Sequence, residues 1–356
     1  MKKPVFMKGN EAVIEGAIAA GCKAVLGYPI TPSTEGLEYA VKRMRQIGGI
    51  AKQMESEAAV SHALYGAGAV GIRAMTITSG PGFNWMHDAV DYMATSEVPT
   101  NIIDIMRGGP ALGNIAPSQS DVRSAKGGAN GDYRTIILAP SSVQNLADFT
   151  FLAFELADKW RNPVFVLGDG MLGQMKETLI LPEPITELPE KPWRLSGAKN
   201  RPPNKFIPFD LNPAGLEAIN KKLDRKYNQI KETEIRYEAI NIKKPDILVV
   251  AFGLVARIIK SVIKEAEKEN LSIGLIRPIT LWPFPDEVIN QAAERTNKIL
   301  VVEMNMGQIV DDVRLAVNGK TPVKFYGRAG GLITTTEEIT EKIKEVLNIV
   351  KGEVQR

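Results

Sequence analysis

The first half of the chain alternates short apolar runs with stretches in which apolar residues recur at helical spacing. The apolar runs are rich in β-branched residues and are bounded by glycine, proline and polar residues, as buried strands are. Strands that alternate with helices in this way indicate a parallel, doubly wound α/β sheet. The pattern predicts strands at 23–27, 50–54, 72–78, 100–106 and 163–167, and helices at 10–20, 34–46, 57–69, 84–94 and 148–160.

A second alternating unit follows a stretch without periodicity. The segment after Thr178 (LILPEPITELPEKPWRL) is rich in proline and is typical of a linker, and the charged helical spacing of 214–239 predicts a bridging helix. From Asp246 (ILVVAFG) the alternation resumes. We therefore predict three parts, and the last of them has an ordinary domain size. The three parts are a first domain at 1–180, a linker and bridging helix at 181–243, and a smaller α/β domain at 244–356. Within the last part, the pattern predicts helices at 255–268, 285–294, 309–318 and 336–350 and strands at 272–276, 298–303 and 323–326.

Composition narrows the classes of function. The 356 residues carry 44 Lys and Arg against 41 Asp and Glu, a net charge of +3, so no strong field points to nucleic acid as a partner. A single cysteine, Cys22, forms no intrachain disulfide framework, and one thiolate cannot hold an iron–sulfur cluster. Neither a signal peptide after Met1 nor a membrane-spanning apolar run is evident, so we expect a cytoplasmic protein with no membrane partner.

Three loops that follow predicted strands carry candidate chemistry. The SGPG motif at 79–82 lies where glycines let a ligand approach the backbone and helix amides are free, although a tight turn explains it equally well. Glu55 and Glu57 begin a helix and periodicity does not separate them; Ser56 as the N-cap, with Glu57 in the first turn, is a complete structural explanation. Arg107 ends a strand, where a guanidinium either pairs with a surface acid or receives a carboxylate.

Other conspicuous residues have simpler interpretations. Gly168-Asp-Gly170 starts like a metal- and diphosphate-binding motif of some cofactor enzymes, but the paired asparagines that complete such a motif do not follow, and Asn200 stands alone. A strand-ending turn is therefore favoured. His62 and His87 lie in helical patterns without metal-ligand spacing, and Cys22 is interpreted as a small core residue.

The order of the motifs carries a resemblance. YPITPST, QMESEAAV, TITSGPGF, IMRGGPALGNIAPSQSD and VVEMNMGQIVDDVRLAVNG occur in this order over nearly the whole chain. The chain resembles the α subunits of the 2-oxoacid:ferredoxin oxidoreductases, most closely the branched-chain (3-methyl-2-oxobutanoate, or 2-ketoisovalerate) members. The resemblance implies CoA-dependent oxidative decarboxylation of a 2-oxoacid to acyl-CoA and CO2, with electrons passed to ferredoxin. It also implies a pyrimidine-binding domain of the thiamine diphosphate superfamily at 1–180 and a domain similar to the transketolase C-terminal domain at 244–356.

The same resemblance implies an active site at an interface between chains. A separate β subunit would hold the diphosphate of the cofactor and its Mg²⁺, so this chain is expected to supply no metal ligand. Iron–sulfur clusters would belong to partner chains, such as γ and ferredoxin-like subunits, which is consistent with one cysteine. The enzyme would be active only as a heteromeric complex, of a kind typical of anaerobic metabolism.

Individual site residues follow from the matching motifs. Glu57 matches the glutamate that bonds the aminopyrimidine ring and is the expected catalytic residue, because a carboxyl at that ring nitrogen favours the imino tautomer that activates the thiazolium carbon. Arg107 and Thr31 match the residues that bind the substrate carboxylate. Pro29 and Pro32 would stiffen the turn that presents the Thr31 hydroxyl. The other cofactor contacts implied by the resemblance are Tyr28, Pro29, Ser79 and Gly80.

Three alternatives remain open. In a 2-oxoglutarate member, Arg123 and Lys126 would supply a second cation, although the stretches IAPSQSD and VEMNMGQ favour the branched-chain members. A thiamine-dependent non-oxidative decarboxylase or synthase would need the diphosphate motif on this chain. A non-catalytic scaffold subunit would not need Thr31, Glu57 and Arg107 together.

Overall fold

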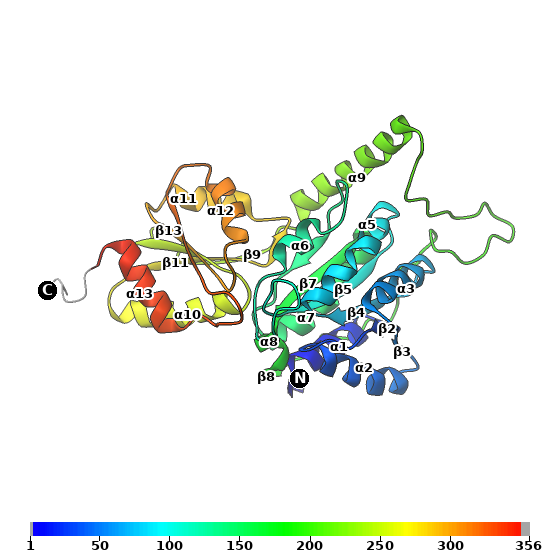
Figure 1. The fold of residues 1–356 in the computed structure, drawn as a ribbon, viewed down its shortest axis with the longest axis horizontal. Helices are drawn as coiled ribbons and strands as arrows, with labels where there is room; N and C mark the ends of the chain where they lie inside the picture. The colour runs from blue at the N-terminus through cyan, green and yellow to red at the C-terminus, as the bar shows by residue number, and fades with distance from the viewer. Residues whose placement is uncertain (1–2, 350–356) are drawn as a thin grey trace.

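The apolar runs of the first half form six strands of a seven-stranded sheet that is covered by helices on both faces (Figure 1), and β12 of the second half adds the seventh strand at an edge. The central strands are buried along their whole length, which is the arrangement that continuous apolar runs favour in parallel sheets. All pairs are parallel except the edge pair of β12 with β6. This computed structural model describes residues 3–349. The order of the strands across the sheet is β12 (Thr280–Trp282), β6 (Ile136–Leu138), β7 (Pro163–Asp169), β5 (Thr100–Met106), β4 (Ala74–Thr78), β2 (Ala24–Gly27) and β3 (Ile50–Gln53).

Two groups of helices bury their apolar sides against this sheet. One group packs with the core around Ile14 and Leu146, and the other with the core around Leu64 and Phe83. The first group consists of α1 (Gly9–Ala19), α2 (Thr34–Gln46) and α7 (Val143–Trp160), and the second of α3 (Glu57–Ala69), α4 (Gly80–Trp85), α5 (His87–Thr95) and α6 (Val122–Gly127). A short helix, α8 (Gly170–Gln174), follows β7 and leads into an antiparallel pair of β1 (Val5–Lys8) with β8 (Lys176–Leu179).

A second, five-stranded sheet forms the smaller domain. It is parallel except for one antiparallel edge strand, β9. Its strands lie in the order β14 (Val323–Gly327), β13 (Ile299–Glu303), β10 (Ile247–Val250), β11 (Ile273–Pro278) and β9 (Tyr237–Ile240). Figure 1 shows α10 (Gly253–Lys268) and α13 (Thr336–Leu347) on one side of this sheet and α11 (Asp286–Ala293) and α12 (Ile309–Val317) on the other.

The connection between the domains is long and partly irregular. Residues 180–212 contain no helix or strand, as the proline-rich composition predicts, and they lead into the amphipathic helix α9 (Pro213–Thr233). Figure 1 shows both the loop and the start of α9 projecting from the body of the molecule. In the described part of the chain, no helix is long and apolar enough to cross a membrane.

Most predicted elements are confirmed, and the helices at 34–46 and 57–69 and the strand at 100–106 have the predicted bounds. The helix predicted at 84–94 is wrong in form, because helical turns begin at Gly80 inside the SGPG motif and a break at Met86 divides α4 from α5. The helix predicted from Asp148 begins at Val143, where Ser142 caps it by accepting a hydrogen bond from the Asn145 amide.

The bridging helix predicted at 214–239 is also wrong at its end. The helix ends after Thr233, and Tyr237–Ile240 pairs with β11 as a strand. Glu234 explains the break, because its buried carboxylate accepts hydrogen bonds from Lys159 and Trp160 and so anchors the chain to α7. The last helix ends at Leu347, and the predicted end at Val350 lies outside the described residues, as does Met1.

Candidate active site

Four neighbouring strands present the candidate residues at one edge of the larger sheet. Strands β5, β4, β2 and β3 are adjacent and parallel, so their carboxyl ends meet at the same edge. The loops that leave these ends contain all residues that the sequence assigns to the site. Open parallel sheets bind ligands at this edge.

The loop after β2 is anchored by hydrogen bonds to its backbone carbonyl oxygens. The carbonyl oxygen of Pro32 accepts hydrogen bonds from Asn10 Nδ2 at 2.8 Å and from Gln174 Nε2 at 3.1 Å. Ser33 Oγ donates to the carbonyl oxygen of Ile30 at 2.8 Å. On the outer side of this loop, Tyr28, Pro29 and Thr31 are exposed to solvent. The loop is therefore a rigid support with an accessible outer side.

Arg107, at the end of β5, is buried and fixes two loops. Its Nη1 donates to the carbonyl oxygen of Thr31 at 2.8 Å, and its Nη2 donates to the carbonyl oxygen of Leu112 at 3.0 Å. The guanidinium forms no ion pair with a described carboxylate, and Nε is buried without a hydrogen-bond acceptor. Arg107 therefore meets Thr31 through the backbone, and it retains N–H groups that can bind a ligand.

The segment that follows Arg107 folds back over the strand end. Gly108 donates its amide to the carbonyl oxygen of Ala116, and Asn114 donates its amide to the carbonyl oxygen of Gly108, both at 2.8 Å. Gly113 has a φ of +56°, and a Cβ there would lie 1.7 Å from the carbonyl oxygen of Gly108. Only glycine fits this approach, which explains why the motif closes as a compact loop above the arginine.

The structure places Glu57 inside the site and Glu55 outside it. Ser56 caps α3 by accepting a hydrogen bond from the Ala59 amide, as the sequence predicts. The Glu55 side chain is exposed and accepts a hydrogen bond from Ser56 Oγ. The Glu57 carboxylate instead packs against the SGPG turn, where Glu57 Oε1 would lie 2.6 Å from a Cβ on Gly82.

Two cavities of about 410 Å³ and 460 Å³ adjoin at Arg107. Glu57 and Leu112 line the larger, and Asp121 and Met306 line the smaller. Both cavities are also lined by Pro81, Asn84, Arg107 and Ala111. The acid and the guanidinium therefore line the same cavity, the larger of the two.

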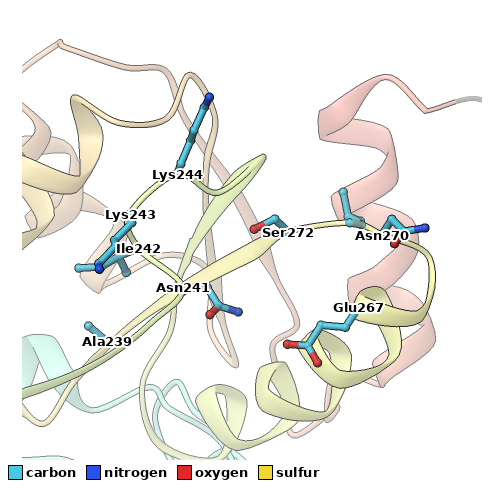
Figure 2. Close-up of a pocket in the computed structure, with 9 residues that line it drawn as sticks. Ala239, Asn241, Ile242, Lys243, Lys244, Glu267, Asn270 and Ser272 are labelled. Carbon is cyan, nitrogen blue, oxygen red and sulfur yellow. The ribbon is translucent and has the colours of Figure 1, made fainter.

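A larger hollow of about 650 Å³ lies in the smaller domain, away from this edge (Figure 2). It adjoins Ser272, just before the amino end of β11. In Figure 2 the ammonium of Lys244 and the carboxylate of Glu267 lie on opposite sides of the hollow and do not converge. Volume alone therefore does not identify the site.

The smaller domain completes the smaller cavity through a clamp at Gln119. Its Nε2 donates to the carbonyl oxygen of Phe252 at 2.9 Å, and its Oε1 accepts from the Met304 amide at 3.0 Å. Asn305 Nδ2 in turn donates to the carbonyl oxygen of Gln119 at 2.7 Å. These buried contacts bring Met306 to the rim of the cavity.

The turn that carries Met306 is fixed by Glu303. This fully buried carboxylate accepts the backbone amides of Gln308, Ile309 and Val310 at the start of α12. Burial raises the pKa of Glu303, while these amide donors oppose that rise. The motif VVEMNMGQIVDD therefore lines the smaller cavity from the smaller domain, together with Ala329 and Gly330.

Several buried polar atoms of the site have no hydrogen-bond partner among the described residues. They belong to the side chains of Thr78, Ser79, Asp104 and Asp121. Burial raises the pKa of Asp104 well above its usual range, and the neighbouring Asp121 reinforces the rise. Burial likewise raises the pKa of Asp121. Unpaired buried polar groups are rare in folded proteins and are concentrated here.

Sequence reasoning missed Asp104, Asp121 and Gln119. Asp104 had a usable signal, because it is an acid inside the apolar run TNIIDIM, and acids seldom lie in a buried central strand unless they are paired. Asp121 and Gln119 lie in a stretch without periodicity, so only the folded chain shows what they contact.

The simpler interpretations of the other residues are confirmed. Asp169 of the GDG sequence ends β7 and caps α8, with its Oδ1 accepting the amides of Met171 and Leu172. Burial raises the pKa of Asp169 to about 6. Cys22 is fully buried, and burial raises the pKa of its thiol to about 12. Burial also lowers the pKa of His87 to about 4.

Comparison with known proteins places this geometry among cofactor-dependent oxidoreductases. Residues 15–240 match the family described as pyruvate flavodoxin/ferredoxin oxidoreductase, thiamine diphosphate-binding, and residues 245–339 match pyruvate:ferredoxin oxidoreductase core domain II. The ketoisovalerate oxidoreductase subunit VorB of Methanothermobacter thermautotrophicus is 43% identical over 96% of this chain and 97% of its own. The 2-oxoglutarate synthase subunit KorA of Methanothermobacter marburgensis is 36% identical over 96% of this chain and 99% of its own.

Solved structures agree with these matches. The 2-oxoglutarate:ferredoxin oxidoreductase from Magnetococcus marinus, with 2-oxoglutarate, coenzyme A and succinyl-CoA bound, superposes with a TM-score of 0.86 at 28% identity. The superposition covers 97% of this chain and 66% of that chain. A split-gene transketolase superposes with a TM-score of 0.60 at 13% identity, over 96% of this chain and 99% of that one, which shows a shared fold.

Proposed function

This chain belongs to the 2-oxoacid:ferredoxin oxidoreductase family, and on that premise we propose that it is the α subunit of an enzyme that oxidatively decarboxylates 3-methyl-2-oxobutanoate to an acyl-CoA. The fold is the expected thiamine diphosphate-binding α/β architecture with a smaller, transketolase-like domain. The observation that carries the proposal is the convergence of Glu57 and Arg107 on one hollow at the edge of the sheet.

The choice of a branched-chain substrate rests on sequence and on charge. The two VorB relatives are 43% and 42% identical to this chain, above the 36% of the first KorA relative. Arg123 and Lys126, which would hold a second carboxylate, are instead paired with Asp311 and Asp312. The rim residue Met306 adds an apolar side chain to the cavity. The 2-oxoglutarate alternative stays the second candidate, because KorA relatives and a solved 2-oxoglutarate enzyme are similar to this chain.

Residues of the site fit the pyrimidine end of thiamine diphosphate. The Glu57 carboxylate opens into the larger cavity, and the nearby Thr78 and Ser79 have buried hydroxyl oxygens without a hydrogen-bond partner among the described residues. Ser79 and Gly80 lie where the backbone allows a close approach, and Tyr28 and Pro29 are exposed on the neighbouring loop. Glu57, Ser79, Gly80, Tyr28 and Pro29 would therefore hold the ring.

The proposed roles of the side chains follow from their chemistry. When bound, the cofactor supplies the nucleophilic carbon and the electron sink for decarboxylation. Glu57 would hold and exchange a proton at the ring nitrogen. The free N–H groups of Arg107 would bind the carboxylate of the 2-oxoacid, because a guanidinium matches a carboxylate in shape and charge. The Thr31 hydroxyl, carried by the anchored loop, would donate the second hydrogen bond.

The metal and diphosphate end of the cofactor is proposed to lie in a β subunit. Asp169, the acid of the GDG sequence, is fully buried and bound by backbone amides, so it is not available as a ligand. The rim of the two cavities also carries several exposed apolar side chains, which a partner chain would cover. These side chains are Trp85, Leu112 and Met306, which line the cavities, and Ile115 and Leu332, which lie close to lining residues along the chain. Iron–sulfur clusters, together with γ and ferredoxin-like subunits, are assigned to the partner side of the complex, which passes electrons to ferredoxin.

Co-expression with the genomically neighbouring subunits tests this function. The purified complex should reduce a low-potential dye only when a 2-oxoacid and CoA are both present, with the highest kcat/KM on 3-methyl-2-oxobutanoate. A highest kcat/KM on 2-oxoglutarate would establish the second candidate instead. A complex that contains thiamine diphosphate but oxidises no 2-oxoacid would contradict both, and would favour a scaffold role or a non-oxidative reaction.

A further inference from the structure

Three groups meet at Gly80, behind the surface of the smaller cavity. The Gly80 amide donates to Asp104 Oδ1 at 3.1 Å. A Cβ on Gly80 would lie 3.9 Å from Asp121 Oδ2 and 3.9 Å from Arg107 Nε. Gly80 has a φ of +37°, which a side chain would strain, so glycine permits this convergence. Asp104 comes from the middle of β5, and Asp121 precedes α6.

The two acids face each other and leave one oxygen each without a donor. Both carboxyls adjoin Gly80, and burial together with the negative charge of Asp121 raises the pKa of Asp104. Asp104 is fully buried and Asp121 is 8% exposed, yet Oδ2 of each has no partner among the described residues. Two ionised carboxylates cannot satisfy one another, because both only accept hydrogen bonds. A single proton between them satisfies both and removes one buried charge.

The position of Asp121 supports this arrangement independently. It occupies the N-cap position of α6, where an aspartate ordinarily accepts a helix amide, but its side chain makes no such bond. The neighbouring Ser120 donates to the carbonyl oxygen of Arg107 at 2.9 Å, which ties this segment to the end of β5. The Asp121 carboxyl is therefore directed to Asp104 and does not cap its own helix.

We propose that Asp104 and Asp121 share one proton and act as a monoanionic positioning pair behind Arg107. The pair holds the Gly80 turn through the Gly80 amide. Its net charge also determines how strongly Arg107 binds the carboxylate of the 2-oxoacid. This inference rests on the proposed function for its substrate, but the shared proton itself does not. Neither acid touches the reacting atoms in this role.

His87, Arg123 and Glu303 are already neutral or paired, whereas Glu57 lines the larger cavity together with Arg107. On α5, burial lowers the pKa of His87 to about 4, so that it is neutral at working pH. On α6, Arg123 is paired with Asp311 of α12. Glu303, before α12, binds backbone amides. Arg107 is therefore the cation whose binding of a carboxylate changes when the pair loses its proton.

The pair predicts a specific dependence of KM on pH. Loss of the shared proton places a second negative charge near Arg107, so the substrate carboxylate is bound less tightly. The KM of the wild-type complex should rise about 10-fold or more as the pH is raised above neutrality and the pair loses its proton. In Asp121→Asn the amide donates to Asp104, and no second carboxyl is present to lose a proton. This variant should lose the alkaline rise, so that its KM at high pH equals its own KM at neutral pH.

Asp169→Asn is the matched control. Asp169 is a buried acid with a raised pKa at the end of the adjacent strand β7, but it caps a helix and has no carboxyl partner. The control should retain the alkaline rise in KM. An equal rise in wild type and Asp121→Asn, or loss of the rise in the control, would overturn the proposal.

Infrared difference spectroscopy separates the pair from the proposed function. The wild-type complex at neutral pH should show the C=O stretch of one protonated carboxyl that both Asp121→Asn and Asp104→Asn lack and that Asp169→Asn keeps. Absence of this band refutes the shared proton. If the band is present but the complex oxidises no 2-oxoacid, the pair stands and the proposed function fails.

Discussion

At the scale of single residues, position within a helix distinguishes two acids that look alike in sequence. Glu55 and Glu57 flank the capping residue Ser56, and only the first helical residue turns its carboxylate into the hollow. Arg107 shows the same dependence on context. Its side chain is fixed by the carbonyl oxygens of Thr31 and Leu112, so its fork is oriented before any ligand arrives. Such preorganisation reduces the entropy lost on binding.

Glu57→Gln tests the catalytic assignment. Glutamine keeps the size of the side chain and can still accept a hydrogen bond, but it cannot exchange a proton at the cofactor ring. We expect kcat of the complex to fall by about 10² to 10⁴, the range typical of general acid–base catalysis. Glu55→Gln is the matched control and should retain wild-type kcat. If the control lost activity and Glu57→Gln did not, the catalytic acid would be Glu55.

Arg107→Met tests recognition of the carboxylate that all 2-oxoacids share. Loss of a hydrogen bond to a charged group costs about 1.5 to 3 kcal/mol, which corresponds to about 10- to 150-fold in kcat/KM. The loss should be at least this large for branched-chain, straight-chain and dicarboxylic substrates alike, and Thr31→Val should lose less. Steady-state kinetics measures both. A variant that changed only the ranking of substrates would contradict the assignment.

At the scale of elements, hydrophobic periodicity predicted the helices and strands whose bounds depend on burial alone. It missed those whose bounds depend on individual contacts. The helix at 57–69 and the strand at 100–106 have the predicted bounds, because their apolar positions face a core. The strand at 237–240 was missed, since the preceding break depends on Glu234 and its partners on α7. Asp104 and Asp121 were missed for a similar reason: their pairing joins a strand to a distant loop.

The SGPG turn provides a prediction about an element. In Gly82→Ala the new Cβ would lie 2.6 Å from Glu57 Oε1 and 2.7 Å from Thr78 Oγ1, so the Glu57 side chain must move. We expect a loss of kcat that approaches that of Glu57→Gln, with the complex still assembled.

Gly66→Ala in α3 is the matched control for this turn variant. Apart from its chain neighbours and the nearby backbone of its own helix, no atom of the described residues lies within 4 Å of its Cβ position. Removing a helical glycine should stabilise the chain by about 0.4 to 1 kcal/mol in denaturant unfolding without changing kcat. A Gly82→Ala complex with wild-type kcat would show that the position of Glu57 is not critical.

At the scale of the whole molecule, two domains form one side of a site. The clamp at Gln119 docks the smaller domain so that Met306 borders a cavity whose other walls come from the larger domain. On the open side, exposed apolar residues form a rim around the hollow. A site with a polar interior and an apolar rim is expected where a second chain closes over a ligand.

The rim gives the last prediction, which concerns assembly. Ile115 is 64% exposed on the loop whose residues Ala111 and Leu112 line the larger cavity, whereas Leu315, at 80% exposed, lies on α12, which contributes no residue to either cavity. A charge at a buried interface is costly, so Ile115→Glu should reduce co-purification of the β subunit, whereas Leu315→Glu should not. Calorimetry with thiamine diphosphate and Mg²⁺ supplies a second measurement: the isolated chain should bind the cofactor weakly and the complex should bind it tightly. Tight binding by the isolated chain, or equal loss of the partner in both variants, would place the cofactor site or the interface elsewhere.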